Sequence, residues 1–416
     1  MTGRRLKVGV LVDLERRASA GGHVKCWEKL ARAAVSRDDL DLTVHVQNAS
    51  EAIEPLSDHV RFISHRPAFS TERLSWIVGN IPDHTDLSPW HPGIAKALPG
   101  YDVVHTTDAF FAMAGTALKV CGRKGIPLVN SVHTDTPGYT RLYTRRTVER
   151  LFGHGFLSRL LLDRLKVDQW QEARMLAKLR KHQFAAHFSL DSDAKSLEEM
   201  KRCLGAGRVG RLRRGIDMDF FSPEHRDRAW LESRFGIARE SVVVLFVGRV
   251  NAGKNVLPAA QAVAEMAAKG HDVHFLAAGE GEEIPVIRQM LKERACLPGS
   301  VPSADMGRLY ASCDIFLFPS MLDVLANVVM EALASGLPVL VNERSGLEPY
   351  FEPNVSGLVV PDHGWGHALE GLLMAPDRRR MLGLAARQHS ERAHPSWGDV
   401  LAQDIMPFWR KAARWE

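Results

Sequence analysis

The stretch that decides the fold is FVGRVNAGKN (Phe246 to Asn255), which completes the apolar run Ser241 to Val247. The run predicts a buried strand, and the two glycines and Lys254 stand in the register of GxxxxGK, a loop that cradles phosphate. The next residue is Asn255, where a P-loop carries the Ser or Thr hydroxyl that ligates Mg²⁺. The stretch therefore predicts a strand followed by a phosphate-holding loop that lacks this metal ligand.

Strand and helix patterns alternate along most of the 416 residues, which predicts parallel sheets covered by helices. The chain is too long for one ordinary core. Both halves open alike, with a strand, a glycine-containing loop and a helix; the strands are 6–14 and 241–247, and the helices are 25–34 and 256–269. Between the halves, Arg211 to Arg226 carries the Gly, Pro and charges of a linker. We expect two doubly wound α/β domains.

Composition places the chain among globular proteins, with 45% hydrophobic and 25% charged residues. No apolar run approaches the roughly 18 residues of a membrane span. The N-terminus passes from basic residues straight into a strand, so we expect no signal peptide and a cytoplasmic protein. The five cysteines form no CxxC pair, which argues against a zinc site or a disulfide framework.

Positive charge is concentrated between Arg141 and Lys181. This segment holds eleven Lys or Arg against four acidic residues, a surplus of seven, whereas the whole chain carries a formal charge of +5. Such a segment suits nucleic acid, an anionic membrane surface or a phosphorylated substrate.

Four loops of the second half follow predicted strands, and ligands of open α/β sheets bind outside the carboxyl ends of strands. They are GRVNAGK (248–254), GEGEE (279–283), PSMLDVLAN (319–327) and NERSG (342–346). The third loop enters a helix whose first amides would form an anion site, contributed by Leu325, Ala326, Asn327 and Val328.

Two acids stand at the spacing D-x₇-E, with Asp323 before this helix and Glu331 inside it. Together with Arg249 and Lys254 they suit a ligand with a diphosphate and several hydroxyls. Each residue also has an ordinary explanation. Asp323 alone would be a helix cap or dipole partner worth about 0.3–1 kcal/mol, and the other three would be exposed surface charges.

The combination of motifs resembles the C-terminal half of family 4 retaining glycosyltransferases of the GT-B fold, in order and spacing across most of residues 241–361. That fold has two facing Rossmann-like domains with a deep cleft between them. The resemblance implies an acceptor-binding domain at 1–214 and a nucleotide-sugar-binding domain at 215–390. It also implies that 391–416 forms a helix packing back towards the first domain.

The resemblance assigns roles in the second half. Arg249 and Lys254 would contact the diphosphate of a UDP- or GDP-sugar, with no metal and no other cofactor. Asp323 would bind the hydroxyls of the transferred hexose and Glu331 those of the ribose, although the family more often has Glu in the first place. The remaining donor-binding residues would be Gly279, Leu325, Ala326, Asn327 and Val328.

In the first half, Gly21 and Gly22 stand where members have a glycine loop near donor phosphate or acceptor, although an ordinary turn into a helix explains them too. The stretch LVNSVHTDTPGY (128–139) resembles the S-x-H-T-D motif of the family, in which the His lies at the reaction centre. This resemblance nominates His133 as catalytic, and Asp135 and Tyr139 as residues that shape the acceptor site.

The form HTDxPxY resembles members that glycosylate diacylglycerol-type lipids. The acceptor would then be a membrane lipid or a lipid-linked glycan. Leu, Phe and Trp are interleaved with the cations of 141–181, which suits an amphipathic surface resting on anionic headgroups at the inner face of the membrane. A solvated helix pair with a buried apolar face explains the segment equally well.

Other classes of protein fit less well. Asp-x-Asp occurs at 39–41, 191–193 and 217–219, as in metal-dependent transferases of the other major fold, but none follows a convincing buried strand. A P-loop NTPase lacks the metal ligand, an NAD-dependent oxidoreductase lacks GxGxxG after a strand, and a nucleic-acid binder rests on the basic segment alone. The nearest rival is a GT-B epimerase or phosphorylase, which needs no separate acceptor alcohol.

Overall fold

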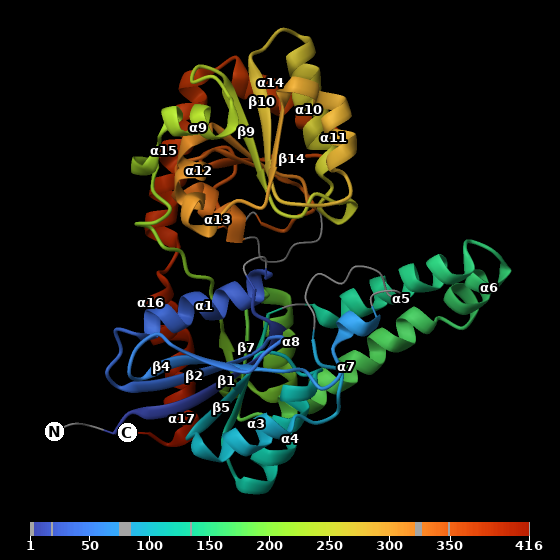
Figure 1. Cartoon of the computed structure of the whole chain (residues 1–416), viewed down its shortest axis with the longest axis vertical. Coiled ribbons are helices and arrows are strands. Elements are labelled where there is room, and N and C mark those ends of the chain that lie inside the picture. Colours follow the sequence, from blue (N-terminus) through green and yellow to red (C-terminus); the bar gives the residue numbers. More distant parts are fainter. Residues whose placement is uncertain are drawn as a thin grey trace. The chain divides into compact units, whose positions relative to one another are not determined.

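The computed structural model (Figure 1) describes residues 4–17, 20–74, 85–133, 135–320, 327–347 and 350–415. The chain forms two compact units. Unit 1 contains Met1–Arg213 together with Trp397–Glu416, and unit 2 contains Arg214–Ser396. The boundaries expected from the sequence lie after residues 214 and 390. Each unit is built on its own sheet, as predicted for an α/β protein.

Unit 1 has an eight-stranded sheet in the order β3-β4-β2-β1-β5-β6-β7-β8. All neighbouring pairs are parallel except β3 with β4. The strands are β1 Leu6–Glu15, β2 Leu40–Gln47, β3 Ala52–Pro55, β4 Val60–His65, β5 Val103–Thr106, β6 Leu128–Val132, β7 Phe188–Asp191 and β8 Val209–Arg211. The chain winds from β1 towards one edge and then returns to β5 on the other side. The carboxyl ends of β1 and β5 therefore mark the topological switch point of this sheet.

Helices cover both faces of this sheet, which explains why its central strands are apolar along most of their length. The helices of unit 1 are α1 Gly22–Ala34, α3 Pro92–Ala97, α4 Ala112–Lys124, α5 Thr136–Phe152, α6 Phe156–Arg159, α7 Val167–Ala185, α8 Ala194–Leu204, α16 Trp397–Asp399 and α17 Met406–Ala413. On one face Val8 and Val10 of β1 pack with α1, and on the other Leu11 packs with α3 and α4. Successive residues of β1 therefore contribute to two hydrophobic cores, one on each face of the sheet.

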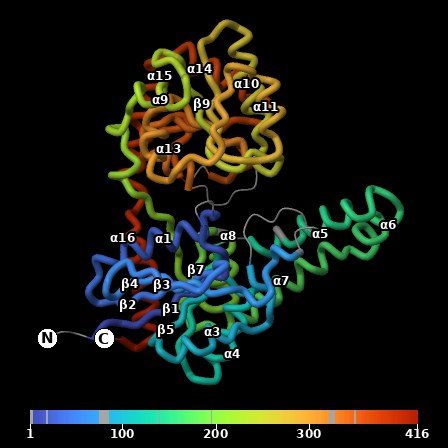
Figure 2. Tube along the Cα trace, viewed as in Figure 1, coloured from blue at the N-terminus to red at the C-terminus, as the bar shows by residue number. Residues whose placement is uncertain are grey.

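The C-terminal segment from Trp397 onward completes the core under α1. Trp397, Ile405 and Trp409 are buried in the same cluster as the central valines of β1. In Figure 2 this red segment passes behind the blue strands of unit 1, against which its side chains pack. The guanidinium of Arg4 lies 5.2 Å from the ring centroid of Trp415, so the first and last described residues of unit 1 are close together.

A helical hairpin extends from unit 1, formed by α5, α6, a π-helical turn at Leu160–Arg164, and α7 (Figure 1). Its two long helices pack against each other around Asp168, which is fully buried. The Asp168 carboxylate lies 3.5 Å from Nε of both Arg141 and Arg145. Because a buried carboxylate needs compensating charge, part of the basic segment serves to hold the hairpin together.

Unit 2 has a six-stranded, fully parallel sheet in the order β11-β10-β9-β12-β13-β14. Its strands are β9 Val242–Val247, β10 Val273–Ala278, β11 Ala295–Gly299, β12 Ile315–Phe318, β13 Val339–Asn342 and β14 Gly357–Val360. Its helices are α9 Arg228–Phe235, α10 Val256–Ala268, α11 Ile284–Leu291, α12 Met306–Ser312, α13 Asn327–Ala334, α14 Trp365–Leu373 and α15 Pro376–Ala393. The switch point of this sheet lies between β9 and β12.

Two cores lie on opposite faces of this sheet. Val243 and Leu245 of β9 pack with α9, α12 and α13, whereas Val244 and Phe246 pack with α10, α11 and α14. All six residues of β9 are apolar, as expected for a strand buried on both faces. The strand predicted from the opening stretch is thus the centre of unit 2.

The loops after β9 and β10 approach each other closely. Gly248 N donates to the Ala278 carbonyl at 3.0 Å, and Val250 N donates to the Glu280 carbonyl at 2.9 Å. A Cβ on Gly279 would lie 1.8 Å from the Gly248 carbonyl oxygen, and the φ of Gly279 is +155°. Only glycine fits this position, because any side chain would separate the two loops.

We predict that Gly279→Ala lowers the free energy of unfolding of unit 2 by at least about 2 kcal/mol, because it adds a backbone clash to an unfavourable φ. Urea unfolding followed by circular dichroism measures the change. Gly371→Ala in α14 is the matched control, since a Cβ there meets nothing within 4 Å. It should stabilise unit 2 by up to about 1 kcal/mol. Equal stability of the two variants would contradict the prediction.

Candidate functional site

The four loops singled out in the sequence follow β9, β10, β12 and β13. All four strands are parallel, so these loops lie at one edge of the sheet of unit 2. The loop after β9 and the segment after β12 flank the switch point, where open α/β sheets bind their ligands. This edge is the candidate donor site of unit 2.

The loop after β9 presents two cations at this edge. Arg249 is exposed and makes no ion pair within the part of the chain that the structure describes. Lys254 ends a single 3₁₀ turn, Ala252–Lys254, in which the Asn251 side chain accepts a hydrogen bond from Lys254 N at 3.2 Å. The turn thus fixes the backbone that carries Lys254, while the Arg249 guanidinium remains accessible to an anion.

Asn255, which replaces the hydroxyl residue of a P-loop, has a structural role. Its φ is +52°, in the left-handed region that Asn tolerates better than most residues, and it joins the 3₁₀ turn to α10. Its Nδ2 donates to the carbonyl of Pro319, which follows β12, at 3.2 Å. The side chain therefore ties the loop after β9 to the segment after β12, across the switch point.

Glu331 lies in α13, the helix that follows this segment. Tyr310 OH in α12 donates to Glu331 Oε2 at 3.1 Å. Burial of Tyr310, reinforced by the adjacent Glu331 charge, raises the pKa of the phenol well above its usual value, so it stays a donor at neutral pH. The carboxylate is thus oriented by a buried phenol. Asn327 and Val328 form the first turn of α13, whereas Asp323, Leu325 and Ala326 lie outside the described residues.

In unit 1, the glycine loop and His133 come together at the carboxyl edge of the sheet. Gly21 is the N-cap of α1 and Gly22 its first residue. The next residue, His23, stacks on His133 with ring centroids 4.4 Å apart and an interplanar angle of 9°. His133 follows β6 and is 8% exposed.

Trp27 and Ser131 contact His133 directly, and His105 contacts Ser131. Trp27 Nε1 donates to its Nε2 at 3.3 Å, and Ser131 Oγ lies 2.8 Å from the same nitrogen. Ser131 Oγ in turn lies 2.9 Å from Nε2 of His105 in β5, which is fully buried. Burial lowers the pKa of His105 to about 3, so this imidazole is neutral at physiological pH.

The two residues expected to shape the acceptor site lie at the start of α5. Asp135 is the exposed N-cap of this helix, where its Oδ1 accepts from Gly138 N at 3.0 Å. A cap is the ordinary role of an Asp at this position. Tyr139 belongs to the first turn of α5, and its side chain lies outside the described residues.

Several polar groups at the edge of unit 1 were not singled out from the sequence. Asp13 at the end of β1 accepts from Met113 N of α4 at 2.6 Å and from the Gln47 amide. Asp108 follows β5 and accepts from Phe110 N at 2.7 Å. Burial raises the pKa of Asp108 to about 6, and burial followed by the nearby Asp108 charge raises that of Asp13 well above its usual value. The signal that was available is their position, since Asp13 lies near the carboxyl end of β1 and Asp108 follows β5.

The three Asp-x-Asp motifs have structural roles. The expectation that none follows a buried strand is wrong for 191–193, because Asp191 ends β7, which is buried throughout. Asp193 there caps α8 by accepting from Ser196 N at 2.7 Å, and Asp191 accepts from Ser196 Oγ at 2.5 Å. Asp217 closes a turn with Phe220 N, and Asp39 pairs with Arg37 and Arg410. Within the described residues, no group of three His, Cys, Asp or Glu is arranged to hold a metal ion.

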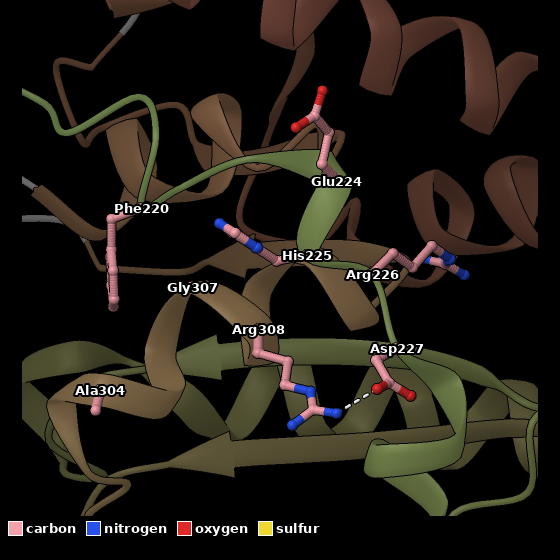
Figure 3. A pocket seen from close by; sticks show the side chains of 8 residues that line it. All are labelled: Phe220, Glu224, His225, Arg226, Asp227, Ala304, Gly307 and Arg308. Carbon is pink, nitrogen blue, oxygen red and sulfur yellow. Dashed lines mark hydrogen bonds and ion pairs between the residues drawn. The ribbon is translucent and has the colours of Figure 1, made fainter.

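The hollow drawn in Figure 3 has a volume of about 370 Å³ and lies beside α12 in unit 2. Its two arginines are engaged with the protein. Arg308 pairs with Asp227, and Arg226 donates to the Cys313 carbonyl and to the Asp314 carboxylate, both at 2.8 Å. It contains none of the site residues predicted from the sequence, and its cations already have partners.

The hairpin of unit 1 carries the basic segment, and its far end is both cationic and apolar. Phe156 is 82% exposed there, and other large apolar side chains around it are also exposed, namely Leu151, Phe152, Leu157 and Leu165. Exposed cations accompany them at Arg150, Arg159, Arg164 and Lys166. Among the described residues, no helix has the length and hydropathy needed to cross a membrane.

Comparison with known proteins agrees with the GT-B architecture. Residues 241–374 match the family model for Glycosyl transferases group 1. The chain is 28% identical, over 70% of both sequences, to the GDP-mannose-dependent alpha-mannosyltransferase of Mycobacterium tuberculosis. It is 26% identical to the alpha-D-kanosaminyltransferase of Streptomyces kanamyceticus, over 63% of this chain and 65% of that relative.

Solved glycosyltransferase structures share the fold along nearly the whole chain. Sucrose-phosphate synthase of Thermosynechococcus elongatus superposes with a TM-score of 0.68 at 16% identity, covering 98% of this chain and 99% of that one. Anabaena HepE, solved in complex with UDP and glucose, superposes with a TM-score of 0.63 at 16% identity, covering 96% and 98%. These matches identify the chain as a glycosyltransferase with the GT-B fold.

Proposed function

We propose that this protein transfers a hexose from a UDP- or GDP-sugar to an acceptor hydroxyl, with retention of anomeric configuration and without a metal ion. The observation that carries the proposal is the edge of unit 2. There the loop bearing Arg249 and Lys254 is tied by Asn255 to the segment after β12, at the switch point of the sheet. The names of relatives support the two candidate donors, since one is GDP-mannose-dependent and a structural neighbour was solved with UDP-glucose.

The cations at this edge suit the chemistry of the leaving group. Breaking the bond between sugar and diphosphate leaves negative charge on the departing phosphate. Arg249 and Lys254, with the first amides of α13, can stabilise that charge as a metal ion would. Glu331, oriented by Tyr310, presents a carboxylate suited to the ribose hydroxyls, and Asp323 is proposed to bind those of the hexose.

Retention is proposed because the paired acids and the loop cations belong to the pattern of retaining members of the family that the sequence resembles. We favour attack by the acceptor on the same face that the diphosphate leaves, with the departing phosphate assisting removal of the acceptor proton. In this mechanism His133 lies near the transferred sugar and forms no covalent bond with it.

The configuration of the product tests retention directly. An α-linked nucleotide sugar should give an α-glycoside, as read from the anomeric proton coupling in an NMR spectrum taken early in the reaction. The donor would first be identified by thermal shift with a panel of UDP- and GDP-sugars. A β-glycoside as the first product would overturn the mechanism, and isomerised donor without any glycoside would indicate an epimerase.

Removing either loop cation should slow transfer. By analogy with the loss of one preorganised oxyanion donor, Arg249→Ala and Lys254→Ala should each lower kcat by about 10²–10³. Lys269→Ala is the matched control, because Lys269 is the C-cap of α10, at the opposite edge of the sheet, and pairs with Glu370. Activity should persist in EDTA. Wild-type kcat in Lys254→Ala, or complete inhibition by EDTA, would contradict a metal-independent role for these cations.

The acceptor is proposed to be a membrane lipid or lipid-linked glycan, reached at the cytoplasmic face of the membrane. The exposed apolar side chains at the far end of the hairpin suit insertion among headgroups, and the arginines around them suit anionic lipid. Arg150, Arg159 and Arg164 make no ion pair within the described part of the chain, whereas Arg141 and Arg145 already compensate Asp168. The membrane-facing cations are therefore those at the tip.

Changing Arg150, Arg159 and Arg164 to Glu should weaken binding to phosphatidylglycerol liposomes by at least about two orders of magnitude, at about 1 kcal/mol for each cation. Co-sedimentation at low and high salt measures the effect, and wild-type binding should fade with salt. The control changes Arg378, Arg380 and Arg392 to Glu, which alters net charge equally on α15 of unit 2. If binding does not depend on lipid charge, or if both variants lose affinity for the liposomes equally, the result would indicate a soluble acceptor instead.

A further inference from the structure

A continuous line of hydrogen-bonding groups crosses the core of unit 1 and ends at His133. It starts in the last helix, where Trp409 Nε1 donates to His105 Nδ1 at 2.9 Å. It continues through Ser131 Oγ to His133 Nε2, and Trp27 Nε1 donates to that last nitrogen from the other side. We call Trp409, His105, Ser131 and His133 the relay. Its first three members are fully buried.

The two indoles fix the direction of every proton in the relay. An indole N–H can only donate, so the nitrogens that it meets must be acceptors. His105 Nδ1 therefore carries no proton, and its Nε2 must carry one and donate it to Ser131 Oγ. The Ser131 hydroxyl then donates to His133 Nε2, which also accepts from Trp27. His133 is consequently neutral, with its proton on Nδ1.

We propose that Trp409 is a positioning residue for His133: it acts through His105 and Ser131 to hold the His133 imidazole in the single neutral tautomer with its proton on Nδ1. The ring orientation is fixed at the same time, because His23 stacks on one face and Trp27 lies edge-on at a centroid distance of 6.0 Å. In this state the Nε2 lone pair of His133 is occupied and cannot accept a proton from the acceptor alcohol. The consequence for turnover rests on the proposed function, in which His133 lies at the reaction centre.

The tautomers can be measured without turnover, from imidazole nitrogen shifts in NMR spectra of histidine-labelled protein at neutral pH. Wild type should show His105 protonated on Nε2 and His133 protonated on Nδ1, each as a single form. In Trp409→Phe, His105 should populate both tautomers. Where His105 Nε2 is unprotonated, the Ser131 hydroxyl can donate to it and accept from His133 Nε2, so a second form protonated on Nε2 should appear at His133 at the expense of the longer, 3.3 Å bond from Trp27. A His133 that is cationic or protonated on Nε2 in wild type would overturn the proposal, as would an unchanged His133 in Trp409→Phe.

Trp397→Phe controls for the loss of an indole from the same segment. Trp397 is 6% exposed, and its Nε1 has no hydrogen-bond partner within the described residues, so its loss removes packing without a hydrogen bond. Both histidines should keep their wild-type tautomers. If Trp397→Phe disturbs His133 as strongly as Trp409→Phe does, packing alone accounts for the effect and the relay is refuted.

Ser131→Ala is a small change that cuts the relay between the two histidines. In this background Trp409→Phe should still alter His105 but should no longer change His133, a loss of coupling that a double-mutant cycle detects. Once a donor is known, Trp409→Phe should lower kcat at least about threefold, in proportion to the fraction of His133 that no longer carries its proton on Nδ1. The KM for the nucleotide sugar should be unchanged. Altered tautomers with unchanged kcat would refute the role in turnover. Absence of transfer from any nucleotide sugar would refute the proposed function, while the spectra still decide the relay.

Discussion

The functional arguments for both units depend on one constraint of parallel sheets. A strand from which the chain winds outward in both directions leaves an open crevice at its carboxyl end, because the loops on its two sides turn away from each other. In unit 2 this strand is β9, and Asn255 connects the two sides of its crevice through the Pro319 carbonyl. The close approach of Gly248 and Gly279 then holds the loop that bears Arg249. The backbone that carries the two loop cations is therefore fixed by contacts of the loop itself.

Unit 1 has the same kind of switch point, at the carboxyl ends of β1 and β5. In this unit the edge beyond these strands is rich in buried polar groups. Unpaired polar atoms in a core cost about 1–3 kcal/mol each, so such a cluster is stable only where its members bond one another. His105, Ser131 and His133 meet this requirement with Trp27 and Trp409, and Asp13 meets it with the Gln47 amide and the first turn of α4. Trp409 of α17 therefore supplies a hydrogen-bond donor for His105 that the strands of unit 1 do not provide.

The sequence predicted the sheets well because a strand buried on both faces is a continuous apolar run. β9 begins one residue after its predicted start and ends at its predicted limit. β7 was not predicted, because Phe188 and Leu190 alternate with Ser and Asp and the strand is only four residues long. The loop residues His133, Arg249 and Lys254 were nominated because the motifs that contain them resemble those of a known family, and the structure places all three after strands of the two sheets. Trp409 could not be found, since 304 residues separate it from His105 and nothing local in either segment indicates the pairing.

The chemical character of a buried histidine is set by what its far nitrogen meets. A carboxylate there accepts the imidazole proton and stabilises the cation, which favours a histidine that takes up protons. An indole has the opposite effect, because it donates and so requires an unprotonated nitrogen. The relay begins at the Trp409 indole, the Trp27 indole donates to its last member, His133, and desolvation independently disfavours a charge on His105. A neutral His133 whose Nε2 lone pair is already occupied does not supply a base. The acceptor proton must then pass to another group, and in the proposed front-face mechanism that group is the departing phosphate.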